Sequence, residues 1–579
     1  MVKYLIFLES FTKQKTIKTF LGNDYEIFAT SGHLTELKKD GYNNLGLGKD
    51  LKEFDFTPRY GLLPEKKKKV EFWQNYLKKN QPTLILLATD PDREGEAIAK
   101  AVVDLLQLKP QQYKRLLFYE ITQQSIRQSL ANLSELNQKL VEAQNARQVL
   151  DRIIGFCLSP LLQKKIRQAL SAGRVQSVVL KLIVDREIAI QEYEKNKEYI
   201  LQGIYETQGE KYALRQKDEK GKLVTYPNKE EAEKVKAQLG SIFSLVKEEK
   251  EKRYIFPKAP FTTSLLLYEA KSQLGFSIAQ TTKLAQQLYE GFYLKSKNKQ
   301  TGLITYPRTD SCRLNKQFIE QTYQYVQKQW GKEYCQFSPQ HQQKKESLNV
   351  QDAHEAIRPT YFSQHPEEIK DSLAPEQFAL YKLIYRHTLA SLMSSAQTEK
   401  TTYTFVNNGY YFTLNENALT FSGFFILNPD YYLPNYKVKK TSLLTEIDLK
   451  SLEVNKIEVK EYLENKPHRY NEGSLVQELE RLGVGRPSTY NTFSRLLLSR
   501  GYVDYNNEKQ KHFVPKELGI KVNEWLQNNF ASLINEKYTA NLETELDKIS
   551  RGENSYLEFI QNFWNSFFPY WQEVSTKPV

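Results

Sequence analysis

The 579-residue chain has a formal charge of +13 and a pI near 9.1, and 40% of its residues are hydrophobic. This length predicts several domains, and the hydrophobic content excludes a disordered chain. A basic excess attracts polyanions, and the 37 tyrosines and 30 phenylalanines offer rings on which bases stack, although a generic basic protein has the same composition.

The three cysteines (157, 312 and 335) form no Cys-x-x-Cys pair, so neither a zinc ribbon nor a disulfide framework is predicted. The apolar run at the N-terminus is too short for a signal peptide, and no run approaches the roughly 20 residues of a membrane span. Leu47 stands where a phosphate-binding loop after Gly41 would need lysine. We therefore expect a cytoplasmic protein without an ATP site.

The first predicted element is a strand over residues 4–8, whose continuous apolar run is typical of a parallel sheet. Glu9 follows it, and Ser10 caps a helix that we expect to reach residue 20 or 21 before Gly22. Lys13 falls in the first turn of that helix, where backbone N–H groups already favour an anion.

A second buried strand is predicted over residues 84–88, and an acidic turn (residues 90–94) leads from it into a helix. In open α/β sheets the functional crevice lies outside the carboxyl ends of the strands, so Glu9 should lie on the same rim. Asp90, Asp92 and Glu94 would repel one another unless they bind a hard cation such as Mg²⁺. The alternative is an acidic helix start that Arg93 and the helix dipole neutralise.

Helices are predicted over about 124–194, with a break at 170–177. In this break small residues permit close backbone approach and Arg174 can hold a phosphate, although such a sequence is also a common turn. The β-type pattern over 195–256 gives way to helices over 262–274 and 279–289, which lead into residues 303–311.

In that segment an apolar run leads to Tyr306, followed by Pro307 and Arg308. A phenol is a poor nucleophile at neutral pH and needs a neighbouring cation or base. Arg308 supplies such a charge, and its planar fork suits phosphate oxygens. Tyrosines are more often packing residues, so other segments must support this interpretation. Further along, His354 lies between an acid and a base, as a structural residue or a phosphate ligand.

A hairpin is predicted around Asn407-Asn408-Gly409. Residues 474–477 form a capping box for a helix that Gly483 ends. Residues 485–490 open another helix, whose Arg486, Ser488 and Thr489 suit either a DNA-backbone grip or an ordinary cap.

Glu9 with the acidic turn resembles the Toprim domain, which topoisomerases share with bacterial primases. Six segments in the family's order then resemble a bacterial type IA DNA topoisomerase of the topoisomerase I kind, lacking the C-terminal zinc ribbons. They are residues 9–13, 90–94, 171–177, 304–311, 353–359 and 485–490.

The resemblance implies a multidomain fold, α/β plus α and β, in which a Toprim domain precedes the interrupted domains of a torus. The expected domains are 1–136 for Toprim domain I, 137–194 with 464–579 for helical DNA-binding domain IV, 195–256 with 395–463 for the β-rich arch domain II, and 257–394 for domain III with the nucleophilic tyrosine.

It also implies ATP-independent relaxation of negatively supercoiled DNA by a monomer near the nucleoid. Tyr306 would form a 5′-phosphotyrosine, Glu9 would act as general acid, and Lys13, Arg308 and His354 would assist. Asp90, Asp92 and Glu94, with Glu9, would hold Mg²⁺. The residues expected near DNA are Arg115, Arg174, Gln176, Arg486, Ser488 and Thr489.

Three alternatives remain at this point. Pro307 is also found in topoisomerase III-like enzymes, which decatenate DNA. A Toprim nucleotidyltransferase or primase would need no tyrosine nucleophile, and a non-catalytic single-strand-binding protein would not need the acidic turn. Because the chain stops after the fourth expected domain, it is either a truncated or a minimal form.

Overall fold

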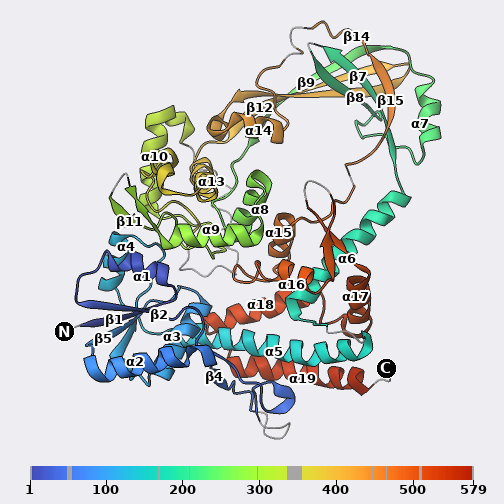
Figure 1. Cartoon of the computed structure of the whole chain (residues 1–579). Helices are drawn as coiled ribbons and strands as arrows, with labels where there is room; N and C mark the ends of the chain where they lie inside the picture. The colour runs from blue at the N-terminus through green and yellow to red at the C-terminus, as the bar shows by residue number, and fades with distance from the viewer. Residues whose placement is uncertain are drawn as a thin grey trace.

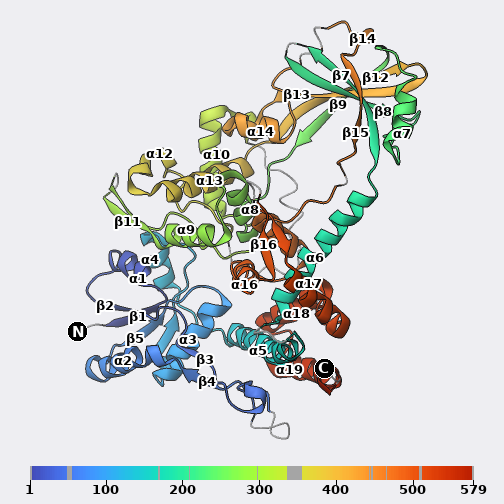
Figure 2. The same cartoon turned by 45° about the vertical axis from the view of Figure 1, so that its right-hand side comes forward.

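The computed structural model describes residues 3–48, 55–166, 170–207, 209–295, 298–335, 355–442, 444, 447–464, 466–507 and 511–576. Their elements are arranged as a ring, with an α/β unit and long helices at the base, a helical unit above the α/β unit, and a β-rich arch (Figure 1). A view turned by 45° shows the same order of units (Figure 2). Within the described ranges, every helix is too short or too polar to cross a bilayer.

The N-terminal unit contains a parallel sheet with the strand order β2-β1-β5-β6. β1 (Tyr4–Leu8) and β5 (Leu84–Leu87) form its centre, because their apolar runs are buried on both faces. Both predicted strands are therefore confirmed. The other elements are α1 (Phe11–Lys18), β2 (Tyr25–Ala29), β3 (Thr35–Leu37), β4 (Tyr60–Leu62), α2 (Lys67–Asn80), α3 (Arg93–Leu105), β6 (Tyr113–Arg115) and α4 (Gln123–Ala131).

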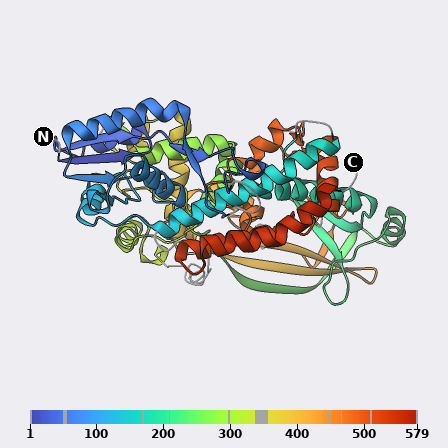
Figure 3. The same ribbon diagram turned by 90° about the horizontal axis from the view of Figure 1, so that it is seen from below.

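The helical part of the base is organised around α5 (Gln138–Ile166), which packs against α3, α18 (Glu536–Arg551) and α19 (Tyr556–Thr576). Seen from below, α5 and α19 run side by side (Figure 3). The predicted break separates α5 from α6 (Arg174–Lys195), which rises from the base to the arch. The remaining helices are α15 (Glu472–Leu482), α16 (Phe493–Ser499) and α17 (Glu517–Phe530), and β16 (Val503–Tyr505) pairs with β17 (Phe513–Pro515).

The arch is an antiparallel sheet with the order β14-β9-β12-β13-β8-β7-β15. Asn408 (φ 47°) and Gly409 (φ 85°) form the tight turn between β12 and β13, which confirms the predicted hairpin. The strands and the helix beside them are β7 (Tyr199–Thr207), β8 (Glu210–Lys217), α7 (Lys229–Lys236), β9 (Ile242–Ile255), β12 (Ala396–Asn407), β13 (Tyr410–Phe421), β14 (Ser451–Glu453) and β15 (Lys456–Glu461).

The helical unit above the N-terminal sheet carries Tyr306, and backbone hydrogen bonds join it to the segment that follows β6. Gly302 N donates to Ile121 O at 2.8 Å, and Tyr306 N donates to Tyr119 O at 2.8 Å. The main elements are α8 (Thr263–Leu274), α9 (Ile278–Glu290), β10 (Phe292–Leu294), β11 (Lys299–Thr301), α10 (Lys316–Trp330), α12 (Pro366–Ile369), α13 (Pro375–Ser391) and α14 (Pro429–Asn435).

Two predicted helix starts are wrong. The capping residue of α15 is Asn471, whose side chain accepts from Ser474 N at 2.9 Å, so this helix begins before the predicted box. α16 begins at Phe493, and residues 485–490 form the turn before it. The helix stop at Gly483 (φ 71°) is confirmed.

Hydrophobic clusters cross the predicted domain limits. One cluster joins Leu8 and Ile121 of the N-terminal unit to Ile304 and Tyr306. Another joins Leu37, Leu45, Leu47 and Phe56 to the helices of the base. The N-terminal unit and the helical unit that carries Tyr306 are therefore packed together in this conformation, and the division into four domains stays a prediction.

Candidate active site

The acidic turn is held by a tight local structure after β5. Asp92 is the N-cap of α3, and its Oδ1 accepts from Gly95 N at 2.7 Å. A Cβ atom on Gly95 would lie 2.1 Å from Asp90 O, so only glycine fits this turn. The structure thus combines both sequence interpretations, because Asp92 caps the helix and still presents its second oxygen to the site.

Each carboxylate of the acidic turn has a partner from another segment. Asp90 forms a buried ion pair with Lys13 of α1. Asp92 Oδ2 accepts from Tyr306 Oη at 2.7 Å. Glu94 Oε2 accepts from Arg308 Nη1 at 3.0 Å. The tertiary structure therefore brings the tyrosine segment to the acidic rim.

The phenol of Tyr306 is only 2% exposed. Burial, followed by the charges of Asp92 and Asp90, raises its pKa well above the ordinary value of 10, although Arg308 acts in the opposite direction. Arg308 thus favours the phenolate, but burial and the two carboxylates outweigh it in this conformation. Arg308 forms an ion pair with Glu94. The phenol of Tyr306 keeps its proton and donates a hydrogen bond to Asp92.

Glu9 lies beside the acidic turn, as predicted, and its Oε1 accepts from Asp90 N at 2.9 Å. Burial, followed by the charge of Asp90, raises the pKa of Glu9 to about 8. Burial alone would lower the pKa of Lys13, but Asp90 and Glu9 raise it overall. The site thus holds a neutral carboxylic acid and a charged ammonium next to each other at neutral pH.

The donor chemistry of the acidic turn fits a hard cation, since carboxylate oxygens are the ligands that Mg²⁺ prefers. In this conformation, however, no three His, Cys, Asp or Glu side chains within the described residues are grouped closely enough to hold a metal ion. The reason is visible in the pairing of Asp90, Asp92 and Glu94, which face Lys13, Tyr306 and Arg308 respectively.

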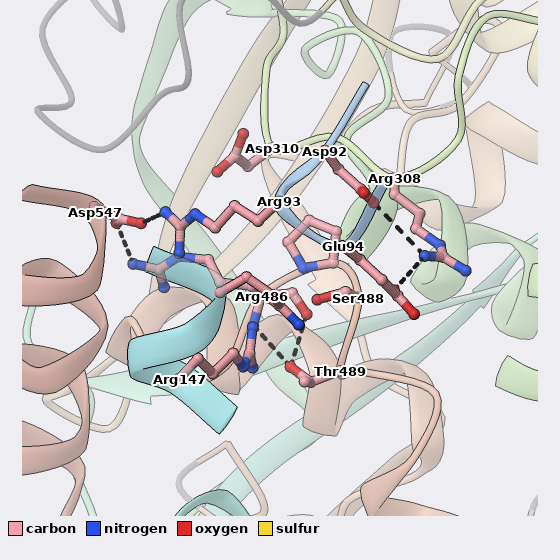
Figure 4. A pocket seen from close by; sticks show the side chains of 12 residues that line it. Asp92, Arg93, Glu94, Arg147, Arg308, Asp310, Arg486, Ser488, Thr489 and Asp547 are labelled. Carbon is pink, nitrogen blue, oxygen red and sulfur yellow. Dashed lines mark hydrogen bonds and ion pairs between the residues drawn. The ribbon is translucent and has the colours of Figure 1, made fainter. Parts of the chain in front are cut away.

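A cavity of about 210 Å³ extends from the acidic turn to helix α18. Asp92, Glu94 and Arg308 lie at one end of it (Figure 4). At the other end Asp547 of α18 accepts from Arg93 and, at 2.6 Å, from Arg486 Nη2 (Figure 4). The remaining lining residues are Gln144, Arg147, Asp310, Pro487, Ser488 and Thr489.

Glu543 and Asp547 of α18 are surrounded by four arginines, and we call this group the arginine cradle: Arg93, Arg147, Arg174 and Arg486. Glu543 has no exposed surface, and its Oε1 accepts from Arg174 Nη1 at 2.6 Å. Although burial raises the pKa of Glu543, Arg174, Arg147 and Arg486 hold it below the usual range. One nitrogen of Arg174, Nη2, has no hydrogen-bond partner among the described residues.

Residues 135–561 match the family model described as DNA topoisomerase, and residues 4–121 match the model of the Toprim domain. The chain belongs to the bacterial type IA DNA topoisomerases. It is 35% identical to DNA topoisomerase 1 of Campylobacter jejuni over 582 residues, which cover 100% of this chain and 80% of that protein. The structure of full-length topoisomerase I from Thermotoga maritima matches with a TM-score of 0.82 and 33% identity, over 99% of this chain and 91% of that one.

These matches confirm the family, the Toprim domain followed by topoisomerase domains, and the class of enzyme. As a DNA topoisomerase, the chain has DNA as its substrate. A primase-like nucleotidyltransferase and a non-catalytic single-strand-binding protein are set aside by the same matches, because the topoisomerase model covers residues 135–561.

Not every DNA-binding residue predicted from the sequence is available to DNA in this topoisomerase structure. Arg115 has no exposed surface, and its guanidinium binds Glu96, at 2.9 Å, and Thr89 Oγ1, at 2.9 Å. The prediction that Arg115 contacts DNA is wrong for this conformation. Its hydrogen bonds instead hold the end of β5 in place before the acidic turn. Gln176 is 8% exposed and donates to Ser171 O at 3.3 Å. His354 lies outside the described residues.

Several residues of the topoisomerase site were not predicted from the sequence. His33 Nε2 lies 3.0 Å from Glu94 Oε1, next to a turn in which Ser31 has φ 58°. Hydrogen bonding to His33 and the charge of Arg308 lower the pKa of Glu94 to about 2, against the effect of burial. The signals in the sequence were a rare histidine after Ser-Gly, and two acids one helical turn apart at residues 543 and 547.

Proposed function

We propose that this topoisomerase cleaves one DNA strand with Tyr306, passes DNA through the break and rejoins it, and so relaxes negatively supercoiled DNA without ATP. The observation that carries the proposal is the 2.7 Å hydrogen bond from Tyr306 to Asp92, which joins residues 214 positions apart at the acidic rim. Underwound duplex is the favoured substrate because it supplies the single strand that such a buried site can take in.

In the proposed cleavage step, Tyr306 Oη attacks the phosphorus of a phosphodiester. The phenol proton passes to Asp92 Oδ2, the P–Oη bond forms, and the bond from phosphorus to the 3′ oxygen breaks. Glu9, which is protonated below a pKa of about 8, gives its proton to the leaving 3′ oxygen. The products are a 5′-phosphotyrosine and a 3′-hydroxyl, and religation reverses each transfer.

Cations beside the phenol support this step. Lys13 and Arg308 lie on either side of the acidic turn and are charged, so they favour the negative charge that develops on the phosphoryl oxygens. To contact the phosphate, Lys13 must loosen its ion pair with Asp90, and Arg308 must loosen its ion pair with Glu94. The supporting role of His354 stays a prediction.

Asp90, Asp92 and Glu94 would hold Mg²⁺, with Glu9 beside them, once DNA or domain movement draws the three side chains away from their present partners. The ion would neutralise phosphate charge at the rim and keep the cut ends aligned. In the absence of the ion, Lys13 and Arg308 carry this neutralisation, so we expect cleavage to depend on Mg²⁺ less than religation and strand passage do.

The arginine cradle is the proposed grip for the strand that approaches the site. Arg486, Ser488 and Thr489 line the cavity, whereas Arg174 and Gln176, at the start of helix α6, are 2% and 8% exposed and would have to be uncovered before they reach DNA. These side chains suit phosphate and sugar contacts, which fix the position of the strand without reading its sequence. A monomer contains the complete site, and cytoplasmic DNA at the nucleoid is its expected partner.

The experiment is adduct capture on single-stranded DNA labelled at either end. After incubation without Mg²⁺ and denaturation, the wild-type chain should retain label that lies on the 3′ side of the cut, since it is joined through the 5′ phosphate. Tyr306→Phe should retain none. Attachment through the 3′ phosphate, or an undiminished adduct with Tyr306→Phe, would refute the proposal, and decatenation faster than relaxation would indicate topoisomerase III-like activity.

A further inference from the structure

A second tyrosine lies in the active site without a role in the steps above. Tyr289, near the end of α9, has no exposed surface, and its ring meets the ring of Tyr306 edge-on, with centroids 5.3 Å apart. On its other side, Lys13 Nζ lies 5.2 Å from the centroid of the Tyr289 ring. Tyr289 therefore contacts both the proposed nucleophile and the cation beside it.

The hydroxyl of Tyr289 is buried and has no hydrogen-bond partner among the described residues. Other fully buried tyrosines behave differently: Tyr381 and Tyr502 each donate to a backbone carbonyl at 2.8 Å. Buried polar groups in folded proteins are nearly always paired, and an exception calls for an explanation such as a missing ligand. The ring that carries this unpaired hydroxyl contacts Tyr306 and Lys13, the two side chains that the proposed step brings to the phosphate.

The backbone around Tyr289 is built to hold it at this place. Gly302 passes so close to α9 that a Cβ atom on it would lie 2.6 Å from Tyr289 O. Leu303 N donates to Leu288 O at 2.8 Å, and Thr16 Oγ1 of α1 donates to Glu290 O at 2.7 Å. The end of α9 is thus fixed both to the strand that leads to Tyr306 and to the helix that carries Lys13.

The protonation state of the phenol suits a donor. Burial, followed by the negative charge of Asp90, raises the pKa of Tyr289 well above 10. At neutral pH its Oη therefore carries a proton that it can donate in a hydrogen bond.

We propose that Tyr289 is a further catalytic residue, whose hydroxyl donates a hydrogen bond to a non-bridging oxygen of the phosphate that Tyr306 attacks. This inference rests on the proposed function of Tyr306. A neutral donor in a site rich in carboxylates adds stabilisation for the phosphoryl oxygens without adding another charge that the carboxylates would capture. No covalent bond to Tyr289 forms in the step.

The test is Tyr289→Phe in the full chain, which removes the hydroxyl and keeps the ring against Tyr306 and Lys13. We expect the single-turnover rate of adduct formation to fall about 100-fold, as it does when one donor to a developing oxyanion is removed. Affinity for single-stranded DNA should stay within about twofold, because the phosphate contacts outside the site dominate binding. Tyr381→Phe, the same change at a paired tyrosine in the core, should leave the rate unchanged.

Phosphorothioate substrates separate a donor from a structural role. With sulfur in place of one non-bridging oxygen, the wild-type rate should differ between the two stereoisomers, and Tyr289→Phe should reduce that difference. An unchanged rate in Tyr289→Phe, or a lowered rate with the full stereoisomer difference retained, would overturn the inference. Failure of the wild-type chain to form any adduct would instead refute the proposed role of Tyr306.

Discussion

The two ends of the cavity contain opposite arrangements of charge. At the acidic turn, four carboxyl groups, including Glu9, face Lys13 and Arg308. In the arginine cradle, four arginines face Glu543, Asp547 and Asp151. One end thus has an excess of acidic side chains and the other an excess of basic ones. A DNA strand that enters the cavity would meet the proposed metal site at one end and the arginines that bind phosphate at the other.

The difference concerns stability as much as function. The carboxylates of the acidic turn are close neighbours, and their partners Lys13, Tyr306 and Arg308 all come from other segments of the site. Glu543 is completely buried among arginines, so its removal would leave uncompensated charge in the interior. We therefore expect substitutions at the acidic turn to reduce activity, and substitutions in the cradle to reduce stability as well.

The largest expected effect on activity comes from Gly95→Ala. The added methyl group would lie 2.1 Å from Asp90 O, so the turn that carries Asp90, Asp92 and Glu94 must shift. A misplacement of this size costs about 100-fold or more in rate. Relaxation of supercoiled plasmid measures the loss. Gly22→Ala is the matched control, because nothing lies within 4 Å of its Cβ position, and it should relax DNA at the wild-type rate.

Asp92→Asn should separate activity from stability at the same turn. Asparagine also caps helices and can accept from Tyr306, but it cannot take the phenol proton or bind Mg²⁺ as strongly. We expect adduct formation to fall about 100-fold while the melting temperature stays equal or rises, since one repelling charge is lost. A melting temperature several degrees lower, measured by thermal unfolding, would show that this carboxylate stabilises the fold after all.

Glu543→Gln should give the opposite result. Breaking a buried ion pair by removing one partner costs about 3–5 kcal/mol, and Arg174, Arg147 and Arg486 would all lose charge compensation. The melting transition should shift down by several degrees, and DNA affinity should change through the displaced arginines. Glu517→Gln, in an exposed pair with Lys521, is the control and should not move the transition. If the melting temperature of Glu543→Gln equals that of the wild type, the arginine cradle does not stabilise the fold, and the proposed difference in stability between the two ends of the cavity is wrong.

The pH dependence of cleavage reports on Glu9. Its pKa is raised to about 8 by burial and Asp90, so the acid form that protonates the 3′ oxygen predominates below that pH and is lost above it. Adduct formation without Mg²⁺ should therefore be flat up to about pH 8 and then fall about tenfold per pH unit. Glu9→Gln should be slow and show no such fall. A rate that rises through this range would indicate that ionisation of Tyr306 limits cleavage instead.

His33→Gln should have the smallest effect. The 3.0 Å contact with Glu94 is part-exposed, and Arg308 still pairs with the same carboxylate. A single hydrogen bond of this kind contributes about 1 kcal/mol, which corresponds to a change of roughly fivefold in relaxation rate. A loss above 100-fold would mean that His33 takes part in the chemistry and not only in holding Glu94.

Much of the site could be predicted from the sequence, because it depends on short-range patterns. The buried strands at 4–8 and 84–88, the alternating acids after the second strand, and the Tyr306-Pro307-Arg308 segment each lie within a few residues. Parallel strands end on a common rim, so Glu9 and the acidic turn could be placed together without coordinates. The helix starts expected at residues 474–477 and 485–490 were misplaced, because Asn471 caps the first helix and residues 485–490 form a turn before the second.

Only the tertiary structure decided how the segments face one another. The pairing of Tyr306 with Asp92, the neutral phenol, the burial of Arg115, and the placement of Tyr289 against the nucleophile all depend on packing between segments far apart in the chain. The pKa of a side chain depends on its burial and its charged neighbours, and the residues next to it in the sequence determine neither of them. The residue types that can cut DNA are thus evident from the sequence, while their charge states and partners come from the fold.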